Sequence, residues 1–302
     1  MKRLWIAFAF IVGVMPAFAQ EPLPVVASFS IIGDLVKQIG GDRVRVVTIV
    51  GPNADAHGYQ PRPADAKAVA DAKLLVVNGL GFDPWMQRLQ KSSGSKATLI
   101  VASAAIKPMK DTDDGHGHGH GHGHGDTDPH AWHDPTNLKL YARTIRDALV
   151  AADPAGRAAY DERLASYDQA LTALDTENRA ALANIAPERR KIVTAHDAFA
   201  YLGRAYGIQF LAPQGVSTES QPSAKDIARI IRYIRETKAP AVFIETIADP
   251  RQMERIAQES GAKIGGKLYS DALSPPDGPA GTTIDMIRTN IKELSKALAP
   301  QS

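Results

Sequence analysis

The segment that determines the fold is PAGRAAYDERLASYDQALTALDTENRAALANI, residues 154–185, because its apolar residues recur at steps of four and three and so form a stripe along one side of a helix. At 1.5 Å per residue this segment predicts a single helix about 48 Å long, which exceeds the width of a small domain. The same apolar stripe could form the interface of a coiled-coil dimer. The segment has many alanines, however, and such a stripe packs equally well along the back of two domains. We therefore expect a long helix that joins two lobes. The stripe alternates steps of four and three residues: Tyr160, Leu164, Tyr167, Leu171, Leu174, Asn178 (a polar break), Ala181 and Ile185.

On both sides of this helix, short apolar strands alternate with helical segments. Before it, strand patterns occupy residues 24–30, 44–50, 74–79 and 97–103; after it, they occupy 191–196, 208–213 and 241–246. This alternation predicts parallel sheets covered by helices. The fold class is therefore α/β, with two similar lobes and a ligand cleft where their strand ends face each other. The expected domains are an N-terminal lobe (20–153), the connecting helix (154–185) and a C-terminal lobe (186–302).

The N-terminus, MKRLWIAFAFIVGVMPAFAQEP, has the pattern of an export signal. Lys2 and Arg3 precede an apolar run, and Ala17 and Ala19 fit the small-residue rule for cleavage. A membrane anchor is the alternative, but the run is shorter than the roughly 20 residues of a spanning helix. We expect residues 1–19 to be removed and the mature protein to lie in the periplasm.

The composition limits what can hold the protein together and what it can bind. The chain has 302 residues, no cysteine and a net charge of +2. Without cysteine there are no disulfides and no lipid attachment at an N-terminal cysteine, and any metal site must use His and carboxylate ligands. The small net charge gives no indication of a nucleic-acid partner.

Two histidines stand apart from the rest, and each follows a strand pattern. His57 lies in a loop after VVTIV, and His196 ends KIVTAH; His130 and Asp271 occupy further loops, so that each lobe supplies two of the four residues. Any one of these histidines could be an ordinary surface residue. Together, three imidazoles and one carboxylate form a four-coordinate set that suits Zn²⁺, whereas Mn²⁺ or Mg²⁺ would call for more oxygen.

Several motifs resemble the metal-binding solute receptors of ABC transporters, and within them the zinc-uptake members (ZnuA/TroA-like, cluster A-I). The resemblance covers nearly the whole mature chain through DAHGYQPRPADAKAVADAKLLVVNGLGFDPW, DPHAW, TAHDAFAYLGRAYG, ESQPSAKDIARII, VFIETIADP and LYSDALS. It implies two α/β lobes joined by a rigid helix, with metal held between them by His57, His130, His196 and Asp271. Manganese and iron members typically carry Glu where this chain has His196, so the resemblance favours zinc. Many enterobacterial zinc members have a disulfide, which this chain lacks.

Two further residues are candidates near the same site. His133 lies three residues after His130 and could face the same side of a helical turn. The motif match favours His130 as the ligand, and leaves His133 beside the ligands or facing solvent. Glu245 ends the apolar strand pattern AVFIET. It could accept a hydrogen bond from a ligand imidazole, or be an ordinary paired carboxylate.

GHGHGHGHGHG, residues 115–125, is a different kind of feature. Glycine at every second position cannot hold a rigid coordination shell. We expect a flexible His-rich loop (111–128) whose flanking aspartates, Asp128 among them, add negative charge and concentrate divalent cations. A surface insertion without function is the alternative. The expected weak ligands are His116, His118, His120, His122 and His124.

The sequence thus predicts a receptor that is not an enzyme. One Zn²⁺ would bind tightly, further equivalents would bind the loop weakly, and affinity would fall as pH drops through about 6 to 5. Expected partners are an inner-membrane permease with its cytoplasmic ATPase, and possible loading by a periplasmic zinc chaperone; we expect a monomer. Alternatives are a manganese or iron receptor and a periplasmic zinc buffer. A zinc hydrolase would need an open coordination position, and the chain contains no HExxH motif.

Overall fold

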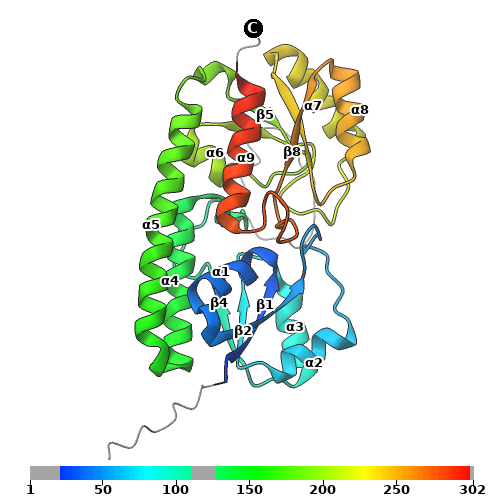
Figure 1. Cartoon of the computed structure of the whole chain (residues 1–302). Helices are drawn as coiled ribbons and strands as arrows, with labels where there is room; N and C mark the ends of the chain where they lie inside the picture. The colour runs from blue at the N-terminus through cyan, green and yellow to red at the C-terminus, as the bar shows by residue number, and fades with distance from the viewer. Residues whose placement is uncertain (1–20, 111–126, 300–302) are drawn as a thin grey trace, which may run out of the picture.

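Two α/β lobes lie end to end along one long helix (Figure 1). The structure, a computed structural model, describes residues 21–110 and 127–299. The predicted signal peptide (1–19) and the five histidines of the His-Gly run lie outside the described residues. The predicted fold class, two α/β lobes with parallel sheets, is confirmed.

The N-terminal lobe is built on a parallel sheet of order β2-β1-β3-β4. The central strands β1 and β3 are largely buried, which explains their unbroken apolar runs. The strands are β1 (Leu23–Phe29), β2 (Val44–Val50), β3 (Leu74–Val77) and β4 (Thr98–Val101). The helices are α1 (Ser30–Gly40), α2 (Pro63–Asp71), α3 (Pro84–Ser93) and α4 (Pro135–Ala152), with short 3₁₀ turns η1 (Gly41–Arg43) and η2 (Ala131–His133).

The C-terminal lobe repeats this topology, with order β6-β5-β7-β8 and parallel pairing throughout. Because parallel strands end at one edge, the loops that follow them gather at the junction between the lobes. The strands are β5 (Lys191–Val193), β6 (Gln209–Leu211), β7 (Ala241–Glu245) and β8 (Lys263–Leu268). The helices are α6 (Ala200–Tyr206), α7 (Ala224–Thr237), α8 (Pro250–Ser260) and α9 (Thr283–Leu298), preceded by the 3₁₀ turn η4 (Pro187–Arg189).

The long helix, α5 (Arg157–Leu182), is shorter than predicted, because Pro154–Gly156 form the separate 3₁₀ turn η3. Its 26 residues span about 39 Å. The apolar stripe also drifts: Ala181 is exposed and Leu182 is buried in its place. A turn of 3.6 residues produces this drift relative to a 3.5-residue repeat. The helix still packs against both lobes, through α1 of one and α9 of the other, with α4 alongside.

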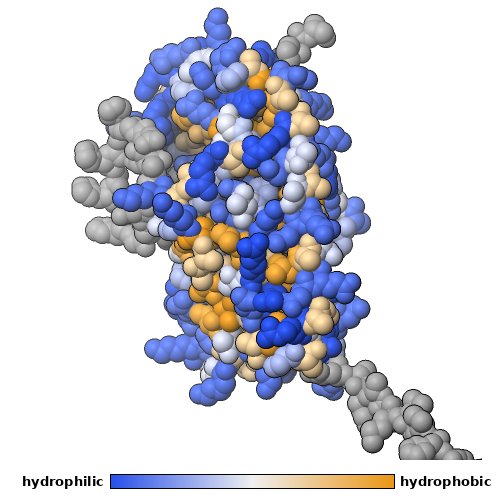
Figure 2. All heavy atoms as spheres, turned by 90° about the vertical axis from the view of Figure 1, so that its left-hand side faces the viewer, coloured by the Kyte–Doolittle hydropathy of each residue, from blue (hydrophilic) through white to orange (hydrophobic). Residues whose placement is uncertain are grey.

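The outer side of α5 gives no sign of the alternative coiled-coil dimer. Hydrophilic residues are spread over this face of the molecule from end to end, with smaller hydrophobic groups between them (Figure 2). Among the described residues, the large hydrophobic side chains that are well exposed are Val47 and Ile264, on β2 and β8. The stripe of α5 is thus used within the chain.

None of the helices in residues 21–110 and 127–299 is long and apolar enough to cross a bilayer.

We predict that Leu171→Ala lowers the free energy of unfolding by about 2–5 kcal/mol, because Leu171 is fully buried on the inner side of α5. Ala173→Ser, on the exposed side of the same helix, should change it by less than about 0.5 kcal/mol. Denaturant unfolding followed by circular dichroism measures both. Equal, small effects of the two substitutions, or a wild-type midpoint that rises with protein concentration, would contradict packing of the stripe within one chain.

Candidate metal centre

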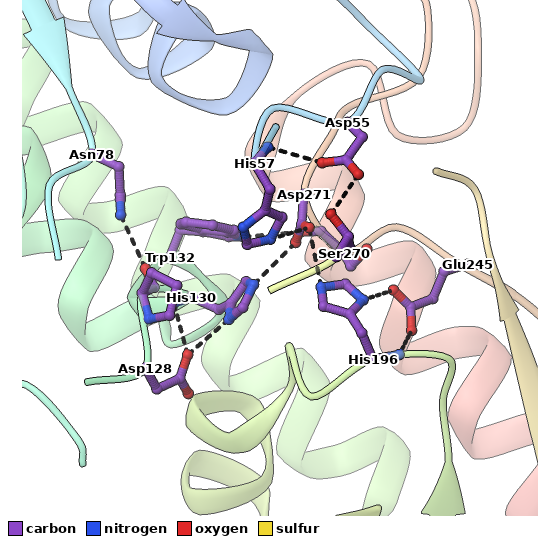
Figure 3. Close-up of polar contacts among 12 residues, drawn as sticks. Asp55, His57, Asn78, Asp128, His130, Trp132, His196, Glu245, Ser270 and Asp271 are labelled. Atoms are coloured by element: carbon purple, nitrogen blue, oxygen red, sulfur yellow. Dashed lines mark hydrogen bonds and ion pairs between the residues drawn. The ribbon is translucent and has the colours of Figure 1, made fainter. Parts of the chain in front are cut away.

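Four side chains converge between the lobes, and their nitrogen and oxygen atoms lie within 4.8 Å of one another (Figure 3). His57 is in the loop after β2, His130 immediately precedes η2, and Asp271 follows β8. The sequence pattern placed His196 at the end of a strand, but β5 ends at Val193 and His196 lies in the loop beyond it. All four residues are buried.

The spacing of these atoms fits one metal ion. Asp271 Oδ2 lies 3.1 Å from His57 Nε2 and 3.1 Å from His196 Nε2, and Asp271 Oδ1 lies 3.5 Å from His130 Nε2. Ligands 2.0–2.1 Å from a tetrahedral zinc ion are about 3.3–3.4 Å apart. His130 Nε2, His196 Nε2 and Asp271 Oδ1 are also buried without a hydrogen bond, which is costly unless a cation binds them.

An aspartate two residues before the histidine positions both N-terminal candidates. Asp55 Oδ1 accepts the His57 backbone N–H at 2.9 Å. Asp128 Oδ1 accepts the His130 backbone N–H at 2.9 Å and lies 2.8 Å from His130 Nδ1. Each is an Asx turn. The sequence pattern for these turns is an aspartate two residues before each histidine, in DAH and DPH, and the predicted set of site residues did not draw on it. Counting Asp128 with the charges of the His-rich loop was wrong, because it is buried beneath His130.

Glu245 holds His196 in a comparable way from the C-terminal lobe. Its Oε1 accepts the backbone N–H groups of Ala195 and His196, at 2.7 and 2.9 Å. Its Oε2 lies 2.5 Å from His196 Nδ1. This contact directs His196 Nε2 towards Asp271 (Figure 3). The position is the one that the sequence suggested for a carboxylate supporting a ligand imidazole.

His133 lies outside the cluster. Its ring packs against Trp132 and Phe199, with centroid distances of 5.8 and 4.8 Å, and it is fully buried. The suggestion that it might face solvent is therefore wrong. Burial is the main cause that lowers the pKa of His133 to about 3, and the neighbouring His130 adds to the lowering. The ring is therefore neutral at physiological pH. Of the two rivals, His130 is the one that meets Asp271.

The N-terminal lobe fixes the segment that carries Asp271. The indole of Trp132 donates to the backbone oxygen of Ser270 at 3.0 Å. The backbone N–H of Asn53 donates to the backbone oxygen of Leu273 at 2.9 Å. Asp271 thus belongs to the C-terminal half of the sequence but is held in place from both lobes. The sequence offers no local signal for these contacts.

The charges in the site are strongly coupled. Burial opposes a charge on His196, but Glu245 and Asp271 outweigh it and raise the pKa of His196 well above its ordinary value. Burial would also raise the pKa of Asp271, yet His196 and His130 hold it well below its ordinary range. When no metal is bound, the directions of these two pKa shifts favour a protonated His196 beside an ionised Asp271.

These features define a metal-binding receptor of the solute-binding class, with two α/β lobes and a buried donor set between them. The chain belongs to the ZnuA family, described as "Zinc-uptake complex component A periplasmic", whose model matches residues 25–297. It is thus a periplasmic metal-binding receptor of an ABC transporter, a system that includes a permease and an ATPase.

The chain is similar to relatives named for several metals. It is 34% identical over 281 residues to the manganese-binding lipoprotein MntA of Halalkalibacterium halodurans, covering 92% of this chain and 89% of the relative. It is 33% identical over 281 residues to the iron-binding protein YfeA of Yersinia pestis, covering 93% and 88%. Family membership therefore assigns metal binding without assigning the metal.

Solved structures agree with the fold. The periplasmic zinc binding protein TroA from Treponema pallidum superposes with a TM-score of 0.85 at 29% identity, covering 93% of this chain and 100% of that one. A manganese-bound mutant of a periplasmic metal binding protein from Candidatus Liberibacter asiaticus gives a TM-score of 0.82 at 30% identity, covering 91% and 99%.

We predict that metal uptake at pH 7 releases about one proton per ion, because His196 must lose its proton to bind. Since the pKa of His196 is raised, affinity should begin to weaken at a higher pH than the range of about 6 to 5 expected for ordinary imidazoles. A pH indicator in weakly buffered solution measures the release. Glu245→Gln removes one of the charges that hold the proton and should release less. Wild-type uptake without proton release would contradict a protonated His196.

Proposed function

We propose that this chain binds one Zn²⁺ through His57, His130, His196 and Asp271 and delivers it to the permease of an ABC importer. One observation carries the choice of metal: three imidazole nitrogens each lie 3.1–3.5 Å from an oxygen of Asp271, and the four donor atoms lie within 4.8 Å of one another. This donor set suits zinc, whereas manganese and magnesium favour oxygen-rich shells. In this role the metal ion is the cargo.

The surroundings of the donors support a receptor rather than a catalyst. A catalytic zinc keeps one position open for water, whereas four protein donors complete a tetrahedral shell. Burial of all four also keeps water from the ion. A periplasmic zinc buffer would use the same chemistry, and membership of a transporter family favours delivery over storage.

The rest of the proposal follows from the sequence. The mature protein begins near Gln20, free in the periplasm, although several relatives are named lipoproteins; this chain has no cysteine to carry a lipid. We propose that it acts as a monomer of two lobes, 20–153 and 186–302, joined by 154–185. The histidines 116–124, outside the described residues, would capture zinc weakly before it reaches the interlobe site, with or without a separate zinc chaperone.

Manganese or iron is the second candidate cargo, favoured by the names of MntA and YfeA. Both carboxylate oxygens of Asp271 face the imidazoles, so a bidentate Asp271 would give a shell of five donors. Against it stands His196, a nitrogen donor at the position where manganese and iron members typically carry Glu.

Competition with a chromogenic chelator tests the proposal. We predict that the purified mature protein holds one Zn²⁺ tightly and Mn²⁺ at least about 100-fold more weakly, since a site of three imidazoles favours zinc in the order of divalent-metal affinities. A variant lacking residues 115–125 should keep the tight zinc and lose only weak equivalents. His57→Ala with His196→Ala should lose the tight zinc.

Two results would contradict this. If the double-alanine variant keeps tight binding, or if tight binding disappears with residues 115–125, the interlobe assignment is wrong. If manganese binds as tightly as zinc, the receptor assignment stands and the choice of cargo fails.

A further inference from the structure

His57 is the ligand nearest to solvent. It is 8% exposed, whereas the other three are at most 1% exposed. A cavity of about 50 Å³ lies beside it. Residues of both lobes line this cavity, among them Leu80, Phe82, Arg88, Val216 and Glu219. Of the four donors only His57 lines it, so an ion that enters from this side meets His57 first.

A loop of the C-terminal lobe, residues 212–223 between β6 and α7, covers this side of the site; we name it the covering loop. Thr218 Oγ1 donates to Asp55 Oδ2 at 2.6 Å. The other oxygen of Asp55 accepts the backbone N–H of His57. One carboxylate thus ties the ligand's own turn to the covering loop (Figure 3 shows Asp55 above His57). Next to it, Glu219 lies over Gly58: a Cβ on Gly58 would be 3.5 Å from Glu219 Cγ.

The covering loop is the weakest part of the enclosure. Of its residues only Pro213 is buried. The Asp271 segment, by contrast, is joined to the N-terminal lobe by a buried bond from Trp132 and a backbone bond from Asn53. Segments with few buried contacts open at the lowest free-energy cost. Among the described residues, displacement of the covering loop should therefore expose the site more readily than displacement of the Asp271 segment.

We propose that metal moves between solvent and the interlobe site along the cavity beside His57, and that Asp55 and Thr218 are positioning residues that set how often the covering loop opens this path. The inference rests on the proposed metal binding by the four donors. Neither Thr218 nor Asp55 belongs to the four donors, so in this proposal their bond closes the path equally with and without metal. Both rates then scale with the open fraction, and the affinity does not.

Thr218→Val removes the donor and keeps the shape of the side chain. Breaking a hydrogen bond to a carboxylate should raise the open fraction roughly tenfold. We expect zinc association and dissociation, followed by stopped-flow chelator exchange, both to accelerate about tenfold, with Kd changed less than about threefold. Thr176→Val, an exposed threonine on α5, is the matched control and should change neither rate. If Kd rises while association is unchanged, the bond only holds His57 in place, and the proposal fails; unchanged rates would also overturn it.

A cross-link tests the same step in the opposite direction. The chain has no cysteine, so Gly58→Cys with Glu219→Cys can form a single disulfide. A Cβ on residue 58 would lie 3.5 Å from Glu219 Cγ, the position that a cysteine sulfur would take, so the two side chains are close enough to be joined. Oxidation should slow both rates at least about tenfold, and reduction should restore them. Each single variant controls for thiol binding of zinc. Equal exchange in oxidised and reduced forms would refute the path. Failure of the metal-binding proposal is recognised separately, because wild-type protein would then hold no zinc at equilibrium.

Discussion

Asp271 is a fully buried carboxylate whose two oxygens face three imidazoles, and the architecture around it serves to keep that arrangement in place. An unpaired charge at such a position would cost several kcal/mol. In the metal-free protein the proton on His196 offsets the cost. A divalent cation offsets it better, because it binds all four donors at once. In the proposed function the site exchanges a proton for a metal ion, and the burial that makes the empty charge expensive favours binding.

The fold supplies the rigidity that this exchange requires. The larger of two hydrophobic clusters runs through both lobes, from Phe29 on β1 through Leu171 on α5 to Leu294 on α9, and the smaller one lies within the C-terminal lobe. Such a shared core opposes large rotations of one lobe against the other. Motion is then expected in surface segments such as the covering loop rather than between the lobes. A receptor of this design can hold its ligands in fixed positions and still exchange its cargo through a small local opening.

Much of this could be predicted from the sequence, because apolar periodicity determines the strands and helices and parallel topology determines where loops meet. His57, His130, His196 and Asp271 each lie in a loop at this junction, so their convergence follows once two parallel sheets are inferred. The drift from Ala181 to Leu182 on α5 was missed, because a heptad count cannot show the small excess twist of a straight helix.

The parts that could not be predicted depend on three-dimensional contacts. In the sequence Asp128 looks like one more acidic residue beside the His-Gly run. Only its hydrogen bonds show that it positions His130. The bond between Asp55 and Thr218 joins residues that are 163 positions apart. The relatives show in addition that one fold accommodates several metals, so the identity of the cargo depends on individual donors such as His196 rather than on the architecture.

The central claim is most directly tested by anomalous diffraction at the zinc edge, from crystals of protein lacking residues 115–125 and loaded with one equivalent of zinc. The account predicts one strong peak between the lobes, about 2.0–2.1 Å from His57 Nε2, His130 Nε2 and His196 Nε2 and from an oxygen of Asp271. A peak elsewhere on the molecule, or a zinc ion that lacks any of these four ligands, would contradict it.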